Sequence, residues 1–594
     1  STPLYSSAAS DVYKRQKVVY VGRDSKRHKA LVAQHLDVIV LLHDNWDDFT
    51  YKTTFPTECR IKGSDVEIGG IQILIENEKT TFAYLDKLVA DGWDGVFPIP
   101  GSQYVSVPAS LSFYEQIDGH LGLDAAIEVA RTLRDASFLA KIEDDGDALR
   151  LLATEGFRKS LQRERGAIKA YLDGWKLFGR KTISIGNQIF RFRKPGEDIS
   201  TIELRFASAS PLPHDINVMI GPNGVGKSQL LHQIVANWLK LDPDIPADTG
   251  FNGRPNLNQV VVISYSPFEL FPVDTSQDKN RKDHDVYRYF GFRGRMKSLT
   301  ESKRGSDKIT LSREFPKTNA ARSLLACLSD DQKYGAIKEW SKKLETMERV
   351  LKSAFPFDRA AVVIDGDADV DSFFATQEWM TEPYLEGPAW DEDGPNLQVR
   401  YVPIASDRVD ELKVLVLGKH LQDRLGVVFL KDGKPLHLSS GQRLFSYIVI
   451  NILGAIRRNS LILIDEPELF LHPTLEIAFI RMLKSILASY GSKALVATHS
   501  LVAVREIPRD CVHVFEQTDQ GLAIKTPPFE TFGGDVQRIS SYVFGDKALS
   551  KPYEDWLRVQ LKEFGTASNL IAALGDDINE ELIIQIHAME REQW

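Results

Sequence analysis

The chain has 594 residues, 43% of them apolar and 26% charged, an ordinary composition for a globular protein of roughly two to four domains. Its formal net charge of -9 excludes a protein that coats nucleic acid over its whole surface, so any DNA contact must be confined to one region. The three cysteines, Cys59, Cys327 and Cys511, lie far apart, which excludes a disulfide framework or zinc site of usual spacing and indicates a reducing compartment.

The first third of the chain carries no motif with a known chemistry. Residues 1–16 lack the apolar core of a signal peptide and resemble translated adaptor sequence, so we expect a disordered or artefactual tail. Short apolar runs between turn residues predict a strand-rich N-terminal domain over residues 17–115. Apolar residues at helical spacing predict a helical connector over residues 116–180.

The longest apolar stretch, residues 444–456, is interrupted by Ser446 and Asn451. It falls short of the roughly 20 residues that a membrane-spanning helix needs. We therefore expect no membrane partner and a cytoplasmic location.

A glycine-rich loop follows the buried-strand pattern of residues 217–220 and precedes a helical run over residues 229–239. This strand, loop and helix order is the context of a G-x-x-x-x-G-K-S phosphate-binding loop, in which backbone amides face the phosphates. We expect Lys227 to contact the β and γ phosphates during catalysis, and the Ser228 hydroxyl to bind Mg²⁺. The residues predicted to contact ATP are Gly221, Pro222, Asn223, Gly224, Val225, Gly226, Lys227, Ser228 and Gln229.

Two carboxylates stand at the end of a second buried strand, over residues 460–466. Ligands collect at the carboxyl ends of parallel strands, so Asp465 is predicted to lie near the metal. Glu466 is predicted to orient or deprotonate the attacking water as the catalytic glutamate. An apolar strand ending in acids is common by itself, but it becomes specific beside a phosphate-binding loop.

Two further motifs complete an ordered set of four. The segment Leu438-Ser-Ser-Gly-Gln442 resembles the signature sequence of ABC-type ATPases, with Ser440 at a position where glycine is usual. A strand-like run then ends at His499, which resembles the switch histidine of the same proteins. The run from Asp465 to Pro473 is closer to the non-transporter branch, which includes RecF-like, OLD-type, SMC-like and bacterial defence ATPases.

This resemblance implies an α/β fold: an ABC-type P-loop head over residues 181–540, with a mostly helical subdomain inserted at about residues 275–395 and a C-terminal helical segment over residues 541–594. It implies a catalytic role for His499 and a homodimer or higher homo-oligomer with two shared ATP sites. In such a dimer one subunit's signature contacts ATP bound to the other, which assigns that role to Ser439, Ser440, Gly441 and Gln442. The glutamine expected after the second strand of the head is not evident, because Ser264 and Ser266 stand there.

Residues 279–322 contain thirteen Lys or Arg against five Asp or Glu, in a chain whose total charge is negative. Basic residues interleaved with tyrosine and phenylalanine can bind phosphates and stack on bases. A solvated lid or a partner-docking surface explains the same segment equally well. The candidate face comprises Arg281, Lys282, Arg288, Arg293, Arg295 and Lys297.

The leading hypothesis is an ATP- and Mg²⁺-dependent ATPase that acts as a molecular switch in antiviral defence and controls a separate effector protein, such as a nuclease. Differential affinity of ATP for the closed dimer would supply the switching energy. An alternative is a DNA-repair or chromosome-handling ATPase that binds DNA through the basic segment. An ABC transporter subunit is the third alternative, and the sequence offers no docking feature for a membrane partner.

Overall fold

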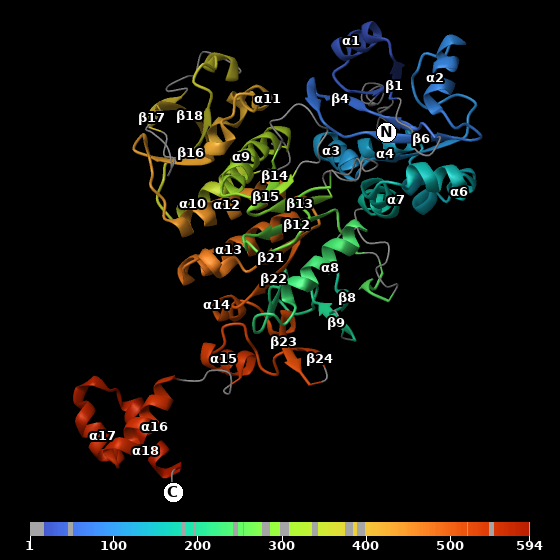
Figure 1. The fold of residues 1–594 in the computed structure, drawn as a ribbon. Helices are drawn as coiled ribbons and strands as arrows, with labels where there is room; N and C mark the ends of the chain where they lie inside the picture. The colour runs from blue at the N-terminus through green and yellow to red at the C-terminus, as the bar shows by residue number, and fades with distance from the viewer. Residues whose placement is uncertain are drawn as a thin grey trace, which may run out of the picture.

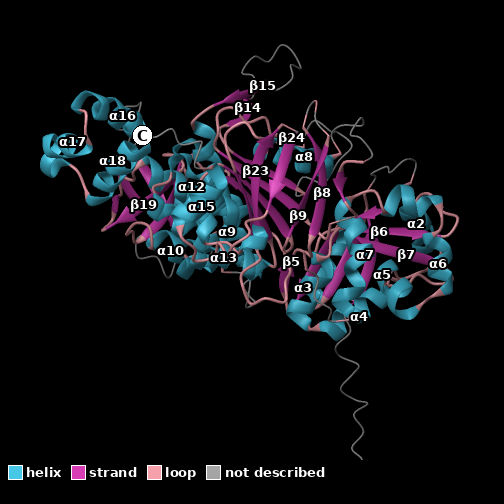
Figure 2. Ribbon diagram, turned by 90° about the horizontal axis from the view of Figure 1, so that it is seen from below, coloured by secondary structure: helices cyan, strands magenta, loops and turns pink. Residues whose placement is uncertain are grey.

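The computed structural model describes residues 17–44, 51–179, 184–194, 196, 198–240, 248–253, 255–275, 286–296, 308–334, 342–374, 384–388, 398–519, 521–545 and 552–592. The predicted tail at residues 1–16 lies outside these ranges. Figures 1 and 2 place the N-terminal domain and the inserted subdomain at opposite sides of a central sheet.

The N-terminal domain begins with a parallel β-α-β unit. Its strands β1 (Lys17–Gly22) and β2 (Val38–Leu42) pair in parallel around helix α1 (Ser25–Gln34). The sheet continues in the order β1-β2-β4-β5, and a second sheet has the order β3-β6-β7. The remaining elements are β3 (Thr54–Phe55), β4 (Thr57–Ile61), β5 (Ser64–Val66), β6 (Ile71–Ile75), β7 (Tyr104–Pro108) and α2 (Thr81–Ala90).

The helices that follow pack into the same hydrophobic core as these strands. Phe113 and Phe178 belong to one buried cluster with Tyr104 and Val18. The segment predicted as a connector thus contributes to the N-terminal core, because its amphipathic helices bury their apolar faces against the strands. The elements are α3 (Ser112–Leu121), α4 (Leu123–Thr132), α5 (Ala136–Phe138), η3 (Leu139–Glu143), α6 (Gly146–Leu152), η4 (Phe157–Leu161) and α7 (Arg165–Phe178).

A seven-stranded sheet with the order β13-β12-β21-β22-β10-β23-β24 forms the centre of the molecule. Neighbours pair in parallel from β13 to β23, and β24 is antiparallel. The inner strands are continuous apolar runs because helices cover both faces. The strands are β10 (Ile216–Ile220), β12 (Gln259–Ser264), β13 (Tyr287–Phe290), β21 (Ser460–Asp465), β22 (Lys493–Thr498), β23 (Val512–Thr518) and β24 (Gly521–Lys525).

The two faces of this sheet carry different helices. Leu463 packs in one core with helix α8 (Lys227–Leu239), whereas its neighbour Ile464 packs in the other core with helix α12 (Ser440–Ala455). The α8 face is also covered by the antiparallel sheet β11-β8-β9, with strands β8 (Gln188–Arg193), β9 (Ile199–Leu204) and β11 (Gly250–Phe251). The α12 face carries α13 (Pro473–Tyr490), α14 (Leu501–Arg505) and α15 (Val536–Phe544).

The predicted α/β head is confirmed. The inserted subdomain, predicted to be mostly helical, also contains several strands. Helices α9 (Glu314–Tyr334) and α10 (Lys343–Lys352) account for the helical periodicity, and a five-stranded antiparallel sheet lies beside them. Its strands are short β-branched runs, which periodicity alone separates poorly from buried helix. The other elements are β14 (Arg293–Met296), β15 (Lys308–Leu311), β16 (Arg359–Ile364), β17 (Leu385–Pro388), β18 (Gln398–Ile404), β19 (Val427–Lys431), β20 (Lys434–Pro435), η5 (Val370–Phe373), η6 (Ser406–Glu411), α11 (Val414–Leu417) and η7 (Asp423–Leu425).

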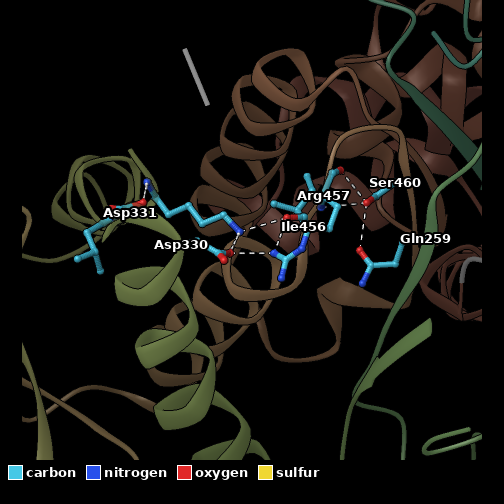
Figure 3. A network of polar contacts seen from close by, with 8 residues as sticks. Gln259, Asp330, Asp331, Ile456, Arg457 and Ser460 are labelled. Atoms are coloured by element: carbon cyan, nitrogen blue, oxygen red, sulfur yellow. Dashed lines mark hydrogen bonds and ion pairs between the residues drawn. The ribbon is translucent and has the colours of Figure 1, made fainter. Parts of the chain in front are cut away.

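A buried polar network joins the inserted helices to the central sheet (Figure 3). Asp330 accepts hydrogen bonds from Lys343 and Arg457, each at 2.8 Å. The Arg457 backbone in turn contacts Ser460, whose hydroxyl donates to Gln259 at 3.2 Å. Lys343 is only 2% exposed, so removing Asp330 would leave an unpaired buried charge. The network therefore fixes α9 and α10 to the amino ends of β21 and β12.

The N-terminal domain also touches the head. The Arg165 guanidinium lies over the Trp238 ring at 4.2 Å from its centroid, and Arg458 forms an ion pair with Glu115 at 3.8 Å. Trp238 lies at the end of α8, and Arg458 precedes β21. The N-terminal domain is thus attached to the far ends of the helix and the strand that carry two of the four motifs.

The C-terminal helices α16 (Pro552–Phe564), α17 (Ala567–Leu574) and α18 (Glu580–Glu592) have a small core of their own, and Figure 1 shows them apart from the head. The short helices η8 (Pro467–Phe470), η9 (Arg509–Cys511) and η10 (Gly575–Asp577) complete the fold. Within the described ranges, no helix combines the length and apolarity that crossing a membrane requires.

Candidate nucleotide-binding site

The predicted phosphate-binding loop runs from the end of β10 to the start of α8. A side chain at Gly221 would come within 2.3 Å of the Phe515 carbonyl oxygen, and Gly224 and Gly226 have φ angles of 75° and 109°. Only glycine meets both demands without strain. The loop therefore turns tightly onto the N-terminus of α8, where backbone amides and the helix dipole favour a phosphate group.

Lys227 is the first residue of α8, and it lies almost wholly buried against the loop. Its amino group donates hydrogen bonds to the carbonyl oxygens of Gly221 at 2.9 Å and Pro222 at 3.0 Å. It also lies 3.1 Å from Nε2 of His499. Burial lowers the pKa of Lys227, and the carboxylates of Glu466, Glu468 and Asp465 oppose that shift.

The side chains of Ser228 and Asp465, both predicted to bind magnesium, are in direct contact. The Ser228 hydroxyl donates to Oδ1 of Asp465 at 2.9 Å. Burial raises the pKa of Asp465 to about 7, and the bond from Ser228 opposes the shift. A hydroxyl and a carboxylate are the hard oxygen ligands that Mg²⁺ uses together with nucleotide phosphates. No cluster of three or more His, Cys, Asp or Glu side chains suited to a metal occurs in the described part of the chain.

Glu466 directly follows β21 and adopts a left-handed conformation, with φ at 49°. Its backbone N–H donates to the Ala497 carbonyl oxygen at 2.9 Å, which ties the turn to the neighbouring strand β22. The strain is typical of residues whose position is set by function. Interaction with His499 holds the pKa of Glu466 below its usual value, so the side chain is ionised.

His499 follows β22 and lies between the two predicted catalytic groups. Its Nε2 is 3.7 Å from Oε1 of Glu466 and 3.1 Å from the Lys227 amino group. Nε2 thus faces both the Lys227 amino group and the Glu466 carboxylate. The structure thus brings together Lys227, Ser228, Asp465, Glu466 and His499 at the carboxyl edge of the sheet.

Two glutamates that the sequence reasoning did not assign support this edge. Glu468 is half-buried in η8, where it accepts hydrogen bonds from the Thr498 hydroxyl at 2.8 Å and from the His499 backbone N–H. Burial raises the pKa of Glu468 above its usual value. Glu476 of α13 accepts from the Ser500 hydroxyl. The repeat of glutamate at 466 and 468 was the available signal, but nothing in the sequence distinguished Glu468 from a solvated acid.

The predicted signature forms the N-terminus of α12, on the sheet face opposite α8. Ser439 is the N-cap and makes a reciprocal pair with Gln442: its hydroxyl accepts the Gln442 N–H at 3.2 Å, and the Gln442 side chain accepts the Ser439 N–H at 3.0 Å. This capping box explains the Ser-x-x-Gln spacing locally. Ser439 and Ser440 are exposed, so the helix terminus is open to solvent.

Strand β12 ends in Ser264, near the point where the resemblance implies a glutamine. Ser264 pairs in register with Asp465 and is fully buried, and its hydroxyl has no hydrogen-bond partner in the described structure. Both side chains alternate onto the α8 face of the sheet, which is the side of the phosphate loop. Ser264 is therefore the nearest counterpart of the missing glutamine on strand β12.

Comparison with protein families adds an independent observation. Residues 367–505 match the family described as "AAA domain, putative AbiEii toxin, Type IV TA system". The matched range contains the signature, both strand-end carboxylates and His499, and the geometry joins these to the phosphate loop at 221–228. The stretch 367–505 is thus similar to AAA domains of this family.

Over most of its length the chain is similar to protein ea59 of Escherichia phage lambda, with 22% identity over 527 residues that cover 84% of this chain and 85% of the relative. Solved structures with similarity include an ATP-binding cassette of an ABC transporter in its ADP conformation, at 14% identity and a TM-score of 0.25 over 62% of this chain and 98% of that one. The SMC head domain from Thermotoga maritima matches at 11% identity and a TM-score of 0.23, over 58% and 100% of the two chains. At these TM-scores the two structures do not by themselves establish a shared fold.

The predicted basic face is only partly described, because Arg281, Lys282 and Lys297 lie outside the described residues. Arg293 donates to the carbonyl oxygens of Phe271 and Glu269. Arg295 donates twice to Asp274, at 2.6 and 3.2 Å. Arg288 is exposed on β13. Intramolecular pairing reduces the charge that Arg293 and Arg295 would offer to a nucleic-acid phosphate.

Proposed function

We propose that this protein binds and hydrolyses ATP with Mg²⁺, and that ATP closes two copies into a dimer that regulates a separate effector protein. The observation that carries this proposal is the convergence of Lys227, Ser228, Asp465, Glu466 and His499 at one edge of the sheet. Residues from three separate chain segments meet there with the acceptors and donors that phosphoryl transfer requires.

Each of these residues has a role that its surroundings support. Water attacks the γ-phosphorus, the bond to the ADP oxygen breaks, and ionised Glu466 orients the water and accepts its proton. Lys227 and the loop amides neutralise charge on the phosphates. Mg²⁺, held by Ser228 and Asp465, supplies further charge neutralisation when bound. Because three carboxylates surround the single Lys227 ammonium, ATP would enter together with its metal ion.

The dimer follows from where the signature lies. The phosphate loop leads into α8 on one face of the sheet, whereas Ser439 caps α12 on the other face and is exposed. The field at a helix N-terminus favours a phosphate. We therefore assign Ser439, Ser440, Gly441 and Gln442 to the γ-phosphate of ATP bound by a second copy, as the resemblance implies.

The effector and the defence role rest on the relatives. The matched family is described in terms of a toxin and a toxin–antitoxin system, in which a toxin is paired with a controlling partner. The relative from phage lambda is a phage protein. We accordingly propose that the switch acts in antiviral defence, through a partner such as a nuclease.

Light scattering on a Glu466→Gln variant tests the switch. This variant should bind ATP without hydrolysing it, so ATP and Mg²⁺ together should raise its molar mass to that of a dimer or tighten an existing assembly. Glu516→Gln, at an exposed site paired with Lys525, is the matched control and should not accumulate the closed form. If the molar mass does not change and the wild type does not hydrolyse ATP, the proposal of two ATP sites shared between subunits is contradicted.

The defence role has a separate test. Cells carrying the wild-type operon, a Lys227→Ala operon or a Lys240→Ala operon would be challenged with a panel of phages. Lys240 caps the far end of α8 and serves as a control for charge removal on the same helix. Protection should be lost only with Lys227→Ala, and equal infection of all three would contradict the defence proposal.

A further inference from the structure

We infer that Glu468 is a positioning residue, which holds His499 beside Glu466 and thereby sets the rate of ATP hydrolysis. The inference rests on the proposed function and extends it to a residue outside the four motifs. Glu468 lies two residues after the catalytic glutamate, in the short helix η8. It therefore belongs to the same turn that carries Glu466.

The carboxylate of Glu468 binds the loop after β22 at two points. One oxygen accepts the hydroxyl hydrogen of Thr498 at 2.8 Å, and the other accepts the backbone N–H of His499. Thr498 also accepts the Ser500 N–H at 2.9 Å, so the same hydroxyl continues the chain of bonds through the loop. A single side chain thus fixes two consecutive residues and, through them, the third.

A second acid holds the other end of this loop. The Ser500 hydroxyl donates to Glu476 of α13 and accepts the Ala503 N–H at 3.1 Å as the N-cap of α14. Both glutamates come from the segment that follows β21. The loop at residues 498–500 is thereby attached to the strand that carries Asp465 and Glu466 as well as to its own strand β22.

This attachment determines where the imidazole lies. With the His499 backbone fixed by Glu468, its Nε2 stands 3.1 Å from Lys227 and 3.7 Å from Glu466. Displacement of a catalytic group by about 1 Å can cost on the order of 100-fold in rate. Loss of the carboxylate would also leave the Thr498 hydroxyl and the His499 N–H without this acceptor, which favours movement of the loop toward solvent. Glutamine keeps one acceptor oxygen and should retain part of the effect.

Hydrogen exchange on the full chain without nucleotide tests the placement directly. In Glu468→Ala, amides of the peptide spanning residues 495–505 should exchange at least about tenfold faster, because the bond to the His499 N–H is lost. Peptides from β23 report global stability and should not change, and Glu516→Ala is the surface control. Unchanged exchange at residues 495–505 would overturn the inference, whatever the hydrolysis rate.

Kinetics then tests whether the placement matters for the reaction. Glu468→Ala should lower kcat by about 10- to 100-fold while KM and the Kd for a fluorescent ATP analogue stay within about twofold, and Glu468→Gln should fall between it and the wild type. In a His499→Ala background, adding Glu468→Ala should slow the enzyme by less than about twofold, because the two residues act through one group. Multiplicative effects, or a large loss of nucleotide affinity, would overturn the positioning role.

These outcomes separate the inference from the proposed function. If the wild type binds and hydrolyses ATP, but the effects of His499→Ala and Glu468→Ala on kcat multiply, only the role of Glu468 is contradicted. A wild type with no hydrolysis contradicts the proposed function, and the exchange experiment still decides whether Glu468 holds the loop.

Discussion

The amino group of Lys227 lies 3.1 Å from Nε2 of His499, and its other two short contacts are the carbonyl oxygens of Gly221 and Pro222. The three N–H bonds of the ammonium thus all have protein acceptors. A γ-phosphate that binds Lys227 must replace at least one of them. If it replaces His499, Nε2 loses its contact with the ammonium, and a ring protonated at Nε2 can then donate to the phosphate or to Glu466.

Replacing this lysine should remove nucleotide binding without unfolding the chain. Lys227→Ala deletes a buried cation that faces the phosphates, and we expect the Kd for ATP to rise at least about 100-fold, as for loss of a charge-assisted contact worth about 3 kcal/mol. Titration with a fluorescent ATP analogue measures the change. Lys240→Ala, at the exposed other end of the same helix, should bind as the wild type does.

Ser439 offers a way to separate helix capping from phosphate contact. Aspartate caps a helix about as well as serine, so Ser439→Asp should melt within about 2 °C of the wild type. Its negative charge would face the γ-phosphate of the second copy, so ATP-dependent association of the Glu466→Gln form should disappear. Ser439→Ala should instead lose about 1 kcal/mol of helix stability. Scanning fluorimetry and light scattering together distinguish the two effects, and association that survives Ser439→Asp would contradict the contact in trans.

The stability of the N-terminal domain should depend on pH through Asp135. This carboxyl is 1% exposed, accepts the Phe138 N–H at 2.8 Å, and has its pKa raised by burial to about 7. Between the unfolded pKa of about 4 and the folded pKa, the folded state holds a proton that the unfolded state lacks, so this contribution falls as pH rises through the window. As the pH rises from 5 to 8, the free energy of unfolding of Asp135→Asn should therefore increase, relative to that of the wild type, by on the order of 2 kcal/mol.

Urea unfolding followed by tryptophan fluorescence at several pH values measures this difference. Asp145 is a matched control because it is also an N-cap, but backbone hydrogen bonds led by the Ala148 N–H lower its pKa. Its contribution is present above the unfolded pKa and lost on acidification. As the pH rises from about 3 to 5, Asp145→Asn should accordingly lose stability relative to the wild type. This change is opposite in sign to that expected for Asp135→Asn.

Arg293 and Arg295 of the basic segment should contribute more to folding stability than to DNA binding. Arg293→Gln with Arg295→Gln removes the partner of Glu269, whose side chain is 2% exposed, and should cost on the order of 1–3 kcal/mol of stability. Affinity for a labelled duplex, measured by anisotropy from low to high salt, should change by less than about twofold. If the two residues instead contact phosphates, the slope of log K against log salt should become about 1.8 less steep, which would favour the DNA-handling alternative.

The sequence was most informative where a motif requires a local conformation. Gly221, Gly224 and Gly226 fix a loop that few sequences can form, so the strand, loop and helix around Lys227 could be predicted from spacing alone. Glu468 could not, because its function depends on β22 lying beside β21, and pairing between strands some 30 residues apart has no signal in a single sequence. The inserted sheet was missed for a related reason: its short strands read as isolated apolar runs until β16 pairs with β18 and β19.

The stacking of Arg165 on Trp238 has a consequence for whatever the N-terminal domain binds. Trp238 ends the helix that begins at Lys227, so a ligand that pulls α7 away from this ring also perturbs the helix that holds the phosphates. Linkage makes the effect mutual: the factor by which such a ligand changes ATP affinity equals the factor by which ATP changes affinity for the ligand. ATP titration at increasing concentrations of candidate ligands is therefore a screen for the molecule that this domain recognises.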